Sequence, residues 1–202
     1  VNKSVTLKGA NRASILTGVS TPPPRIVSVP VSNVKISGFT IKDGGGTRSG
    51  IIVEPPFGKT INSVTITENS FNNTLQAIIL SYCTGCSITK NTFDGNSYPI
   101  RLHDSDVNTI TDNTIKNSLY YGIHIYADSD RNNISCNEVT SNKYGILLEY
   151  SDSNTMYLNK ITSSIEYGIR LSYSTTNLAK GNDIKNNKYG VVVWNCSGNT
   201  FY

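Results

Sequence analysis

Hydrophobic and polar positions alternate along this chain in short runs, and the pattern repeats every 22 to 24 residues. Each unit has two runs rich in Ile, Val, Thr and Tyr between clusters of Asn, Ser, Asp and Gly, as in NTITDNTI at 108–115 followed by YGIHI at 121–125. Such runs are typical of strands and turns, and no segment shows the spacing of an amphipathic helix. One asparagine marks each repeat, at Asn69, Asn91, Asn113, Asn137, Asn159 and Asn182. A period of this length predicts a solenoid of β-strands.

Aligning the units places apolar residues in four columns that we expect to face inward. The first two columns are Ile36, Ile66, Ile88, Ile110, Ile134, Met156, Ala179 and Ile41, Phe71, Phe93, Ile115, Val139, Ile161, Ile184. The other two are Ile51, Ile78, Ile100, Ile123, Ile146, Ile169, Val191 and Val53, Leu80, Leu102, Ile125, Leu148, Leu171, Val193. Coils stacked about 4.8 Å apart would join these columns into one core.

Three further columns hold residues whose identity repeats. The asparagines that mark the repeat are expected to stack their side-chain amides in a ladder. A glycine column, Gly50, Gly122, Gly145, Gly168 and Gly190, predicts a tight bend before the third strand, where a side chain or an ordinary φ would be unfavourable. Equivalent tyrosines form one expected stack, Tyr98, Tyr121, Tyr144, Tyr167 and Tyr189, and a second, broken one, Tyr82, Tyr150 and Tyr173. Repetition in successive coils favours a structural role for these tyrosines.

The repeat runs through residues 33–202 without a linker, which predicts one domain over 1–202. Residues 1–32 are expected to form an opening coil, because Val5, Leu7, Ile15 and Leu16 alternate before a loop rich in proline at 22–24. The chain begins without Met, as an excerpt or a processed protein would. A new unit has just begun at residues 199–202, so we expect an open sheet edge that meets flanking domains or other copies.

Several of these segments carry a family resemblance. NTMYLNKI at 154–161 and YGIRL at 167–171, with VTLKGA at 5–10 and VKISGFTI at 34–41, resemble right-handed parallel β-helix proteins of the pectate-lyase-like superfamily. The similarity is greatest to its carbohydrate-binding and sugar-hydrolase branch, and to the periplasmic copper-accessory β-helices of nitrous oxide reductase systems. It covers nearly the whole chain. It implies an all-β fold, a single right-handed parallel β-helix of about eight coils, in an extracellular, cell-surface or periplasmic setting, often with a polysaccharide ligand.

The enzymes of this superfamily, such as pectate lyases, polygalacturonases and uronate epimerases, carry a charged cluster on one outer face. This chain has neither the closely spaced aspartates of polygalacturonases nor the Asp-Pro-His motif of the epimerases; His103-Asp104-Ser105-Asp106 holds similar residues in another order. Outward positions on the third strand give the candidate ligand-binding residues Arg101, His103, His124, Tyr126, Glu149 and Arg170, on four adjacent coils. Such residues can bind a uronate carboxylate and move a proton, although a solvated polar face is the simpler interpretation. Because both Arg101 and His124 are expected to point outward, replacing them together should leave the fold nearly unchanged.

The candidate metal and thiol chemistry is sparse. Cys83 and Cys86 form Cys-Thr-Gly-Cys at a turn, which suits a local disulfide, a redox pair or half of a metal site, but no second such motif completes a zinc site. Copper favours His, Met and Cys together, and the one methionine lies in a core column. No cofactor is therefore expected, apart from calcium at aspartates near the turns, which are Asp104, Asp106, Asp128 and Asp130.

The chain has a net charge of +4, and its charged residues make up only 16% of 202 residues. No basic stripe follows the repeat, so nucleic acid is not an expected partner, and no segment suits membrane insertion. Three hypotheses follow: a structural or self-assembling scaffold, a glycan-binding module, and a polysaccharide lyase, hydrolase or epimerase. The repeated features serve the fold, so we favour an extracellular or cell-surface scaffold or glycan-binding domain over catalysis.

Overall fold

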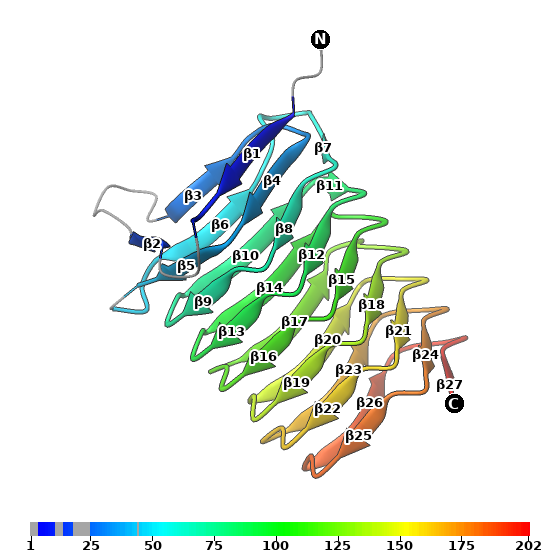
Figure 1. Cartoon of the computed structure of the whole chain (residues 1–202). Helices are drawn as coiled ribbons and strands as arrows, with labels where there is room; N and C mark the ends of the chain where they lie inside the picture. The colour runs from blue at the N-terminus through cyan, green and yellow to red at the C-terminus, as the bar shows by residue number, and fades with distance from the viewer. Residues whose placement is uncertain (1–3, 11–13, 18–24, 44) are drawn as a thin grey trace.

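A computed structural model describes residues 4–10, 14–17, 25–43 and 45–202, and within them it contains strands and no helix. The strands wind into a right-handed parallel β-helix of about eight coils, as the sequence predicts (Figure 1). No helix able to cross a membrane occurs in the described part of the chain. The predicted proline-rich loop at 22–24 lies outside the described residues.

Three long parallel sheets form the walls of the helix. The first sheet contains β1 (Val5–Lys8), β4 (Val34–Ser37), β8 (Thr65–Thr67), β12 (Ser87–Thr89), β15 (Thr109–Thr111), β18 (Asn133–Ser135), β21 (Thr155–Tyr157), β24 (Leu178–Lys180) and β27 (Thr200–Phe201). The second contains β2 (Ser14–Thr17), β5 (Phe39–Lys42), β9 (Ser70–Asn72), β13 (Thr92–Asp94), β16 (Thr114–Lys116), β19 (Glu138–Thr140), β22 (Lys160–Thr162) and β25 (Asp183–Lys185). The third contains β3 (Arg25–Val29), β6 (Ser49–Val53), β10 (Gln76–Ser81), β14 (Tyr98–His103), β17 (Tyr121–Tyr126), β20 (Tyr144–Glu149), β23 (Tyr167–Ser172) and β26 (Tyr189–Trp194), and a short pair joins β7 (Ile61–Asn62) to β11 (Cys83–Thr84).

The four predicted apolar columns form the core. Equivalent residues pair directly, so that Ile110 lies between Ile88 and Ile134 in register, and most column members are fully buried. The exceptions lie at the edge strands β25 and β26, where Ile184 is partly buried and Val191 and Val193 are 40% and 48% exposed. At the other edge, β1 and β2 pair with β4 and β5 as the predicted opening coil requires, although Val5, Leu7 and Ile15 are also about half exposed.

The predicted asparagine ladder is present and fully hydrogen bonded. The Asn113 side-chain oxygen accepts from the Asn91 backbone N–H at 3.0 Å, and its amide donates to the Ile88 carbonyl at 2.9 Å. The same contacts recur from Asn69 to Asn182. A second amide ladder that we did not predict runs Asn108, Asn132, Asn154, Asn177 and Asn199. Buried amides therefore satisfy the backbone groups that each bend removes from the sheets.

The bends depend on residues in the left-handed conformation, most of them not glycine. Lys90, Asp112, Cys136 and Leu158 have φ near +55° and stand immediately before ladder asparagines. The predicted glycine bend is wrong in its position and its φ: Gly122 is the second residue of β17 and has no positive φ. The prediction that a side chain would be unfavourable there holds, because a Cβ on Gly122 would lie 2.8 Å from the Gly145 carbonyl oxygen. Close approach between coils, rather than backbone freedom, explains this glycine.

Candidate functional site

The third sheet brings the six candidate residues together on its outer face. Arg101, His124, Leu147 and Arg170 are paired in register across β14, β17, β20 and β23. Two residues further along, His103 pairs with Tyr126 and Tyr126 with Glu149. The arrangement that sequence alignment suggests is therefore the one in the structure, since parallel pairing without a slip keeps equivalent positions side by side.

Tyrosine rings hold both arginines of this group. The Arg101 guanidinium carbon lies 4.7 Å from the centre of the Tyr126 ring and 5.1 Å from that of Tyr98. Its Nη1 donates to the Gln76 side-chain oxygen at 3.1 Å. Arg170 lies 5.4 Å from the ring centre of Tyr167 in the same way. Cation–π contact and burial of the stems fix the two cationic groups on the sheet.

The tyrosines under these arginines form the predicted stack. The ring centres of Tyr121, Tyr144 and Tyr167 are 5.0 and 5.5 Å apart in sequence order, and Tyr98 and Tyr189 continue the stack at 6.1 and 5.6 Å. Their regular spacing follows the separation of the strands that carry them. This stack supports the sheet and positions the arginines.

His124 is buried, which corrects the expectation that it points freely into solvent. It is 6% exposed, with its ring 4.5 Å from that of Tyr126 and 4.8 Å from that of Tyr121. Its Nε2 lies 3.6 Å from a Glu149 carboxylate oxygen, and neither ring nitrogen has a hydrogen-bond partner. Burial, and then the positive charge of Arg101, lowers the pKa of His124 to about 3. The residue is therefore a neutral packing group beneath the face, and its replacement should disturb the fold.

His103 and Glu149, like the other candidates apart from His124, are partly exposed. The His103 side chain is 31% exposed, and its Nε2 lies 3.3 Å from an Asp104 carboxylate oxygen. The Glu149 side chain is 39% exposed. Both groups can be reached from solvent, whereas His124 is covered.

Aromatic rings continue along the same edge of the sheet, one on each of six adjacent coils. We call Tyr82, His103, Tyr126, Tyr150, Tyr173 and Trp194 the aromatic row; each is the last residue of a strand of the third sheet or the residue after it. Ring centres are 5.5 Å apart for Tyr82 and His103, 5.0 Å for His103 and Tyr126, and 4.8 Å for Tyr150 and Tyr173. Tyr150 is 52% and Trp194 56% exposed. As alignment predicts, they belong to two adjacent register columns, because Tyr126 pairs with Glu149, the residue before Tyr150, and Trp194 pairs with Ser172, the residue before Tyr173.

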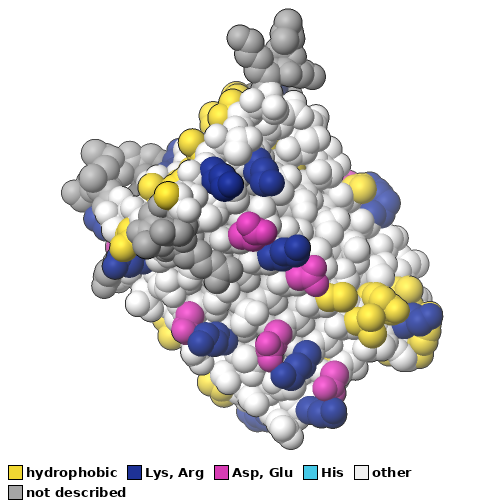
Figure 2. Space-filling view, in the orientation of Figure 1, with side chains coloured by type: hydrophobic (Ala, Val, Ile, Leu, Met, Phe, Trp, Pro, Cys, Tyr) yellow, Lys and Arg dark blue, Asp and Glu magenta, His cyan; other side chains and the backbone are white. Residues whose placement is uncertain are grey.

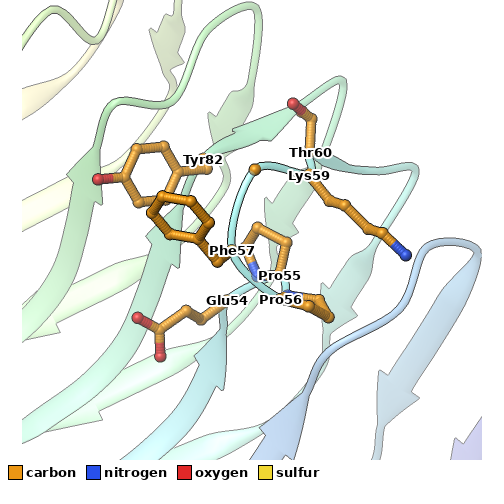
Figure 3. Close-up of a pocket in the computed structure, with 8 residues that line it drawn as sticks. Glu54, Pro55, Pro56, Phe57, Lys59, Thr60 and Tyr82 are labelled. Carbon is orange, nitrogen blue, oxygen red and sulfur yellow. The ribbon is translucent and has the colours of Figure 1, made fainter.

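A pocket that the sequence analysis missed lies at the Tyr82 end of the aromatic row. It has a volume of about 540 Å³ and is lined by residues 54–60 and Tyr82 (Figure 3). Phe57 in this loop is completely exposed. The sequence does contain a sign of this inserted loop. In the first core column Ile36 and Ile66 are 30 residues apart, whereas other neighbours in that column are 22 to 24 residues apart.

Comparison with known proteins places this chain in a family. The family model described as periplasmic copper-binding protein (NosD) matches residues 2–166 and 137–202. The chain belongs to this family. No curated protein matches this NosD-family chain.

Solved structures similar to this NosD-family chain share its fold. The periplasmic alginate epimerase AlgG is 21% identical with a TM-score of 0.76, over 83% of this chain and 44% of AlgG. DFA-IIIase from Arthrobacter chlorophenolicus A6, solved in complex with GF2, is 13% identical with a TM-score of 0.73, over 88% of this chain and 50% of DFA-IIIase. The chain thus spans about half the length of these structures, and identities this low establish the fold alone.

Cys83 and Cys86 of this NosD-family chain continue side-chain ladders, since their backbone N–H groups donate to the Ser105 hydroxyl and the Asn108 side-chain oxygen. Cys83 and Cys86 are both buried free thiols, so the structure does not contain the disulfide considered from sequence. The Cys83 thiol donates to the Ser81 carbonyl at 3.1 Å, and the Cys86 sulfur accepts from the Val64 N–H at 3.4 Å. The neighbouring Cys86 thiol and burial together raise the pKa of Cys83. Within the described residues, no three His, Cys, Asp or Glu side chains converge on a metal position, including the aspartates considered for calcium.

Proposed function

We propose that this protein works outside the cytoplasm as a glycan-binding β-helix, and that the glycan lies along the aromatic row. The observation that carries the proposal is this row itself, with one ring per coil and with Arg101 held against it by Tyr126. The rings of Tyr82, His103 and Tyr126 and those of Tyr150 and Tyr173 contact one another from coil to coil, so they offer two aromatic platforms along the path of an extended polymer. The family description and AlgG, a periplasmic enzyme named for alginate, support the setting and the ligand class.

The chemistry of the face suits an acidic polysaccharide. The apolar faces of sugar rings can pack on exposed tyrosine and tryptophan rings, which lose little conformational entropy on binding. A carboxylate on the sugar can accept charge-assisted hydrogen bonds from the Arg101 or Arg170 guanidinium, which tyrosine rings hold on the sheet. His103 and Glu149 add polar groups that select among hydroxyl arrangements.

Binding fits this geometry better than catalysis. A general base must come within hydrogen-bond reach of the proton it removes, and both nitrogens of His124 are buried under neighbouring rings. The accessible His103 lies 3.3 Å from the Asp104 carboxylate and is not one of the residues that line the pocket. We therefore assign no reaction to the face.

Copper does not fit the candidate residues, although the family description names it. A copper site would need His, Cys or Met donors together, and His124 is buried beside Tyr126 while His103 contacts Asp104. The described residues contain no cluster of three such donors. We derive no copper chemistry for this chain.

The experiment is retention on a panel of alginate, polygalacturonate, chitin and a neutral glucan, with the soluble fraction assayed for new reducing and unsaturated ends. We expect retention on the acidic polymers without new ends. The double variant Arg101→Gln/Arg170→Gln should fold normally and lose the preference for acidic over neutral polymers. Arg131→Gln is the matched control, because its exposed guanidinium pairs with Asp106, outside the candidate face. New chain ends would establish catalysis instead, and no retention on any polymer would favour a purely structural role.

A further inference from the structure

The loop at residues 54–60 is an insertion into an otherwise regular coil. The paired residues Val53 and Ile61 have seven residues between them, whereas their partners on the next coil, Leu80 and Cys83, have two. The longer connection Glu-Pro-Pro-Phe-Gly-Lys-Thr, with five residues more than its equivalent, leaves the wall of the helix and returns to it at β7 (Figure 3). Loops set on a rigid scaffold in this way are where binding residues concentrate.

This loop is held in one shape by its own composition and by contacts at its base. Two consecutive prolines restrict the backbone before Phe57, Gly58 has a φ of +72°, and the Lys59 N–H donates to the Pro56 carbonyl at 3.2 Å. At the base, the Glu54 N–H donates to the Val29 carbonyl at 3.2 Å. Phe57 is therefore displayed by a stiff turn, and a fully exposed phenylalanine on a stiff turn is preorganised for a contact.

Tyr82 also lines the pocket, and its backbone is constrained as well. Its φ is +52°, its N–H donates to the His103 carbonyl at 3.0 Å, and its own carbonyl accepts from the Ile61 N–H at 3.1 Å. The two rings line one pocket of about 540 Å³, within the usual range for small-ligand sites (Figure 3). Glu54 also lines the pocket, and its carboxylate lies 3.5 Å from Arg25.

The pocket also lies where the aromatic row ends. Tyr82 belongs to both, and its ring contacts that of His103, the next member of the row. On the preceding coil the inserted loop replaces the tight turn, so the sheet edge does not continue as a flat surface beyond Tyr82. A polymer lying on the row would therefore terminate at the loop.

We infer that the pocket captures the end of a glycan chain, with the terminal pyranose ring held between Phe57 and Tyr82. The rings contact the two faces of the sugar, and the Glu54 carboxylate accepts hydrogen bonds from its hydroxyl groups. This inference rests on the proposed glycan-binding function and adds a preference for chain ends over chain interiors.

The test compares binding of long polymers with binding of their fragments at the same total mass of sugar. Polygalacturonate and alginate are each cut into defined oligosaccharides, so that the concentration of chain ends rises while the sugar concentration is fixed, and binding is measured by calorimetry. We expect the wild type to bind in proportion to chain ends. Phe57→Ala should lose this dependence and at least tenfold in affinity for oligosaccharides, and Phe57→Tyr should keep both. Leu119→Ala, which alters another exposed apolar residue away from the pocket, is the control and should behave as the wild type.

The outcomes separate the two proposals. Binding that follows total sugar mass in both wild type and Phe57→Ala overturns end capture and leaves the aromatic row as the glycan site. Oligosaccharide binding that Phe57→Ala abolishes, without any retention on long polymers, supports the pocket and overturns binding along the row. No binding of polymer or oligosaccharide overturns both.

Discussion

Two columns of side chains on adjacent parts of each coil obey opposite rules. At the bend before the second sheet, the same residue recurs, and Asn91, Asn113 and Asn137 make identical hydrogen bonds. On the outer face of the third sheet, Arg101, His124 and Leu147 occupy equivalent positions in register and share no chemistry. Where stacking alone determines a position, repeating the same residue satisfies the same hydrogen bonds in every coil. Variation at fixed register therefore marks the surface that is free to acquire a ligand.

The surface visible in Figure 2 differs from both columns in its distribution of charge. Figure 2 shows acidic and basic side chains interspersed there, without a continuous stripe of either sign. Lys116 with Asp94, Lys160 with Glu138 and Lys188 with Glu166 are ion pairs between neighbouring coils. Such exposed pairs add solubility and little stability.

The largest expected effect is loss of a ladder asparagine. Asn113→Ala removes the acceptor of the Asn91 N–H and the donor to the Ile88 carbonyl, both in the buried interior. We expect a decrease of about 3 kcal/mol or more in the free energy of unfolding, since each stranded group costs about 1–3 kcal/mol. Asn133→Ala, whose side chain is exposed on β18 and whose φ is not positive, should change it by less than about 0.5 kcal/mol. Urea unfolding of both variants measures the difference, and equal losses would contradict a special role for the ladder.

A smaller effect should appear as pH dependence of stability through His124. Its pKa is about 3 in the folded protein and near 6.5 when unfolded, so the unfolded state binds more protons between these values. Stability from this residue is complete above pH 6.5 and decreases as the pH falls, by about 1–2 kcal/mol between pH 6.5 and 5. Thermal unfolding at both pH values should show this loss in the wild type and not in His124→Gln. His103→Gln, which alters a partly exposed ring, should retain the wild-type slope.

The aromatic row should affect binding rather than folding. Tyr173→Ala removes a half-exposed ring that stacks on Tyr150, and we expect roughly tenfold weaker binding of an acidic polysaccharide. Tyr157→Ala, a similarly exposed ring on the first sheet, is the matched control and should bind normally. Affinity electrophoresis in polygalacturonate compares the two, and equal mobility would remove Tyr173 from the site.

The smallest effect should follow from breaking a surface ion pair. Lys160→Gln removes the 2.7 Å contact with Glu138, which raises the pKa of Lys160. Both side chains are solvated, so we expect no measurable change in the midpoint of urea unfolding. A clear shift would show that these pairs do more than keep the surface polar.

The sequence predicts positions at which one residue type repeats. It does not predict backbone conformations that depend on packing between neighbouring coils. The columns through Ile110 and Ile115 and the ladder through Asn113 follow from period and composition, and the structure has them in register. The left-handed conformations of Lys90 and Leu158 could not be read from residue type, because stacking imposes them against local preference.

The same limit applied to the candidate site. The grouping of Arg101, His124 and Glu149 was predictable from alignment, but the burial of His124 depends on how the rings of Tyr121 and Tyr126 pack. The pocket beside Phe57 escaped notice because an insertion interrupts the period that the alignment relied on.

The one-to-one register between coils has a consequence for how such a chain can change length. Every strand in the three sheets pairs only with its equivalents one repeat before and after. Excising residues 91–112 would join Lys90 directly to Asn113. Lys90 is left-handed, like Asp112, which normally precedes Asn113, so the new junction has the same conformation and the four apolar columns stay unbroken. Unequal recombination between repeats can therefore add or remove whole coils without a new core having to evolve, which makes the single coil the unit of inheritance in this architecture.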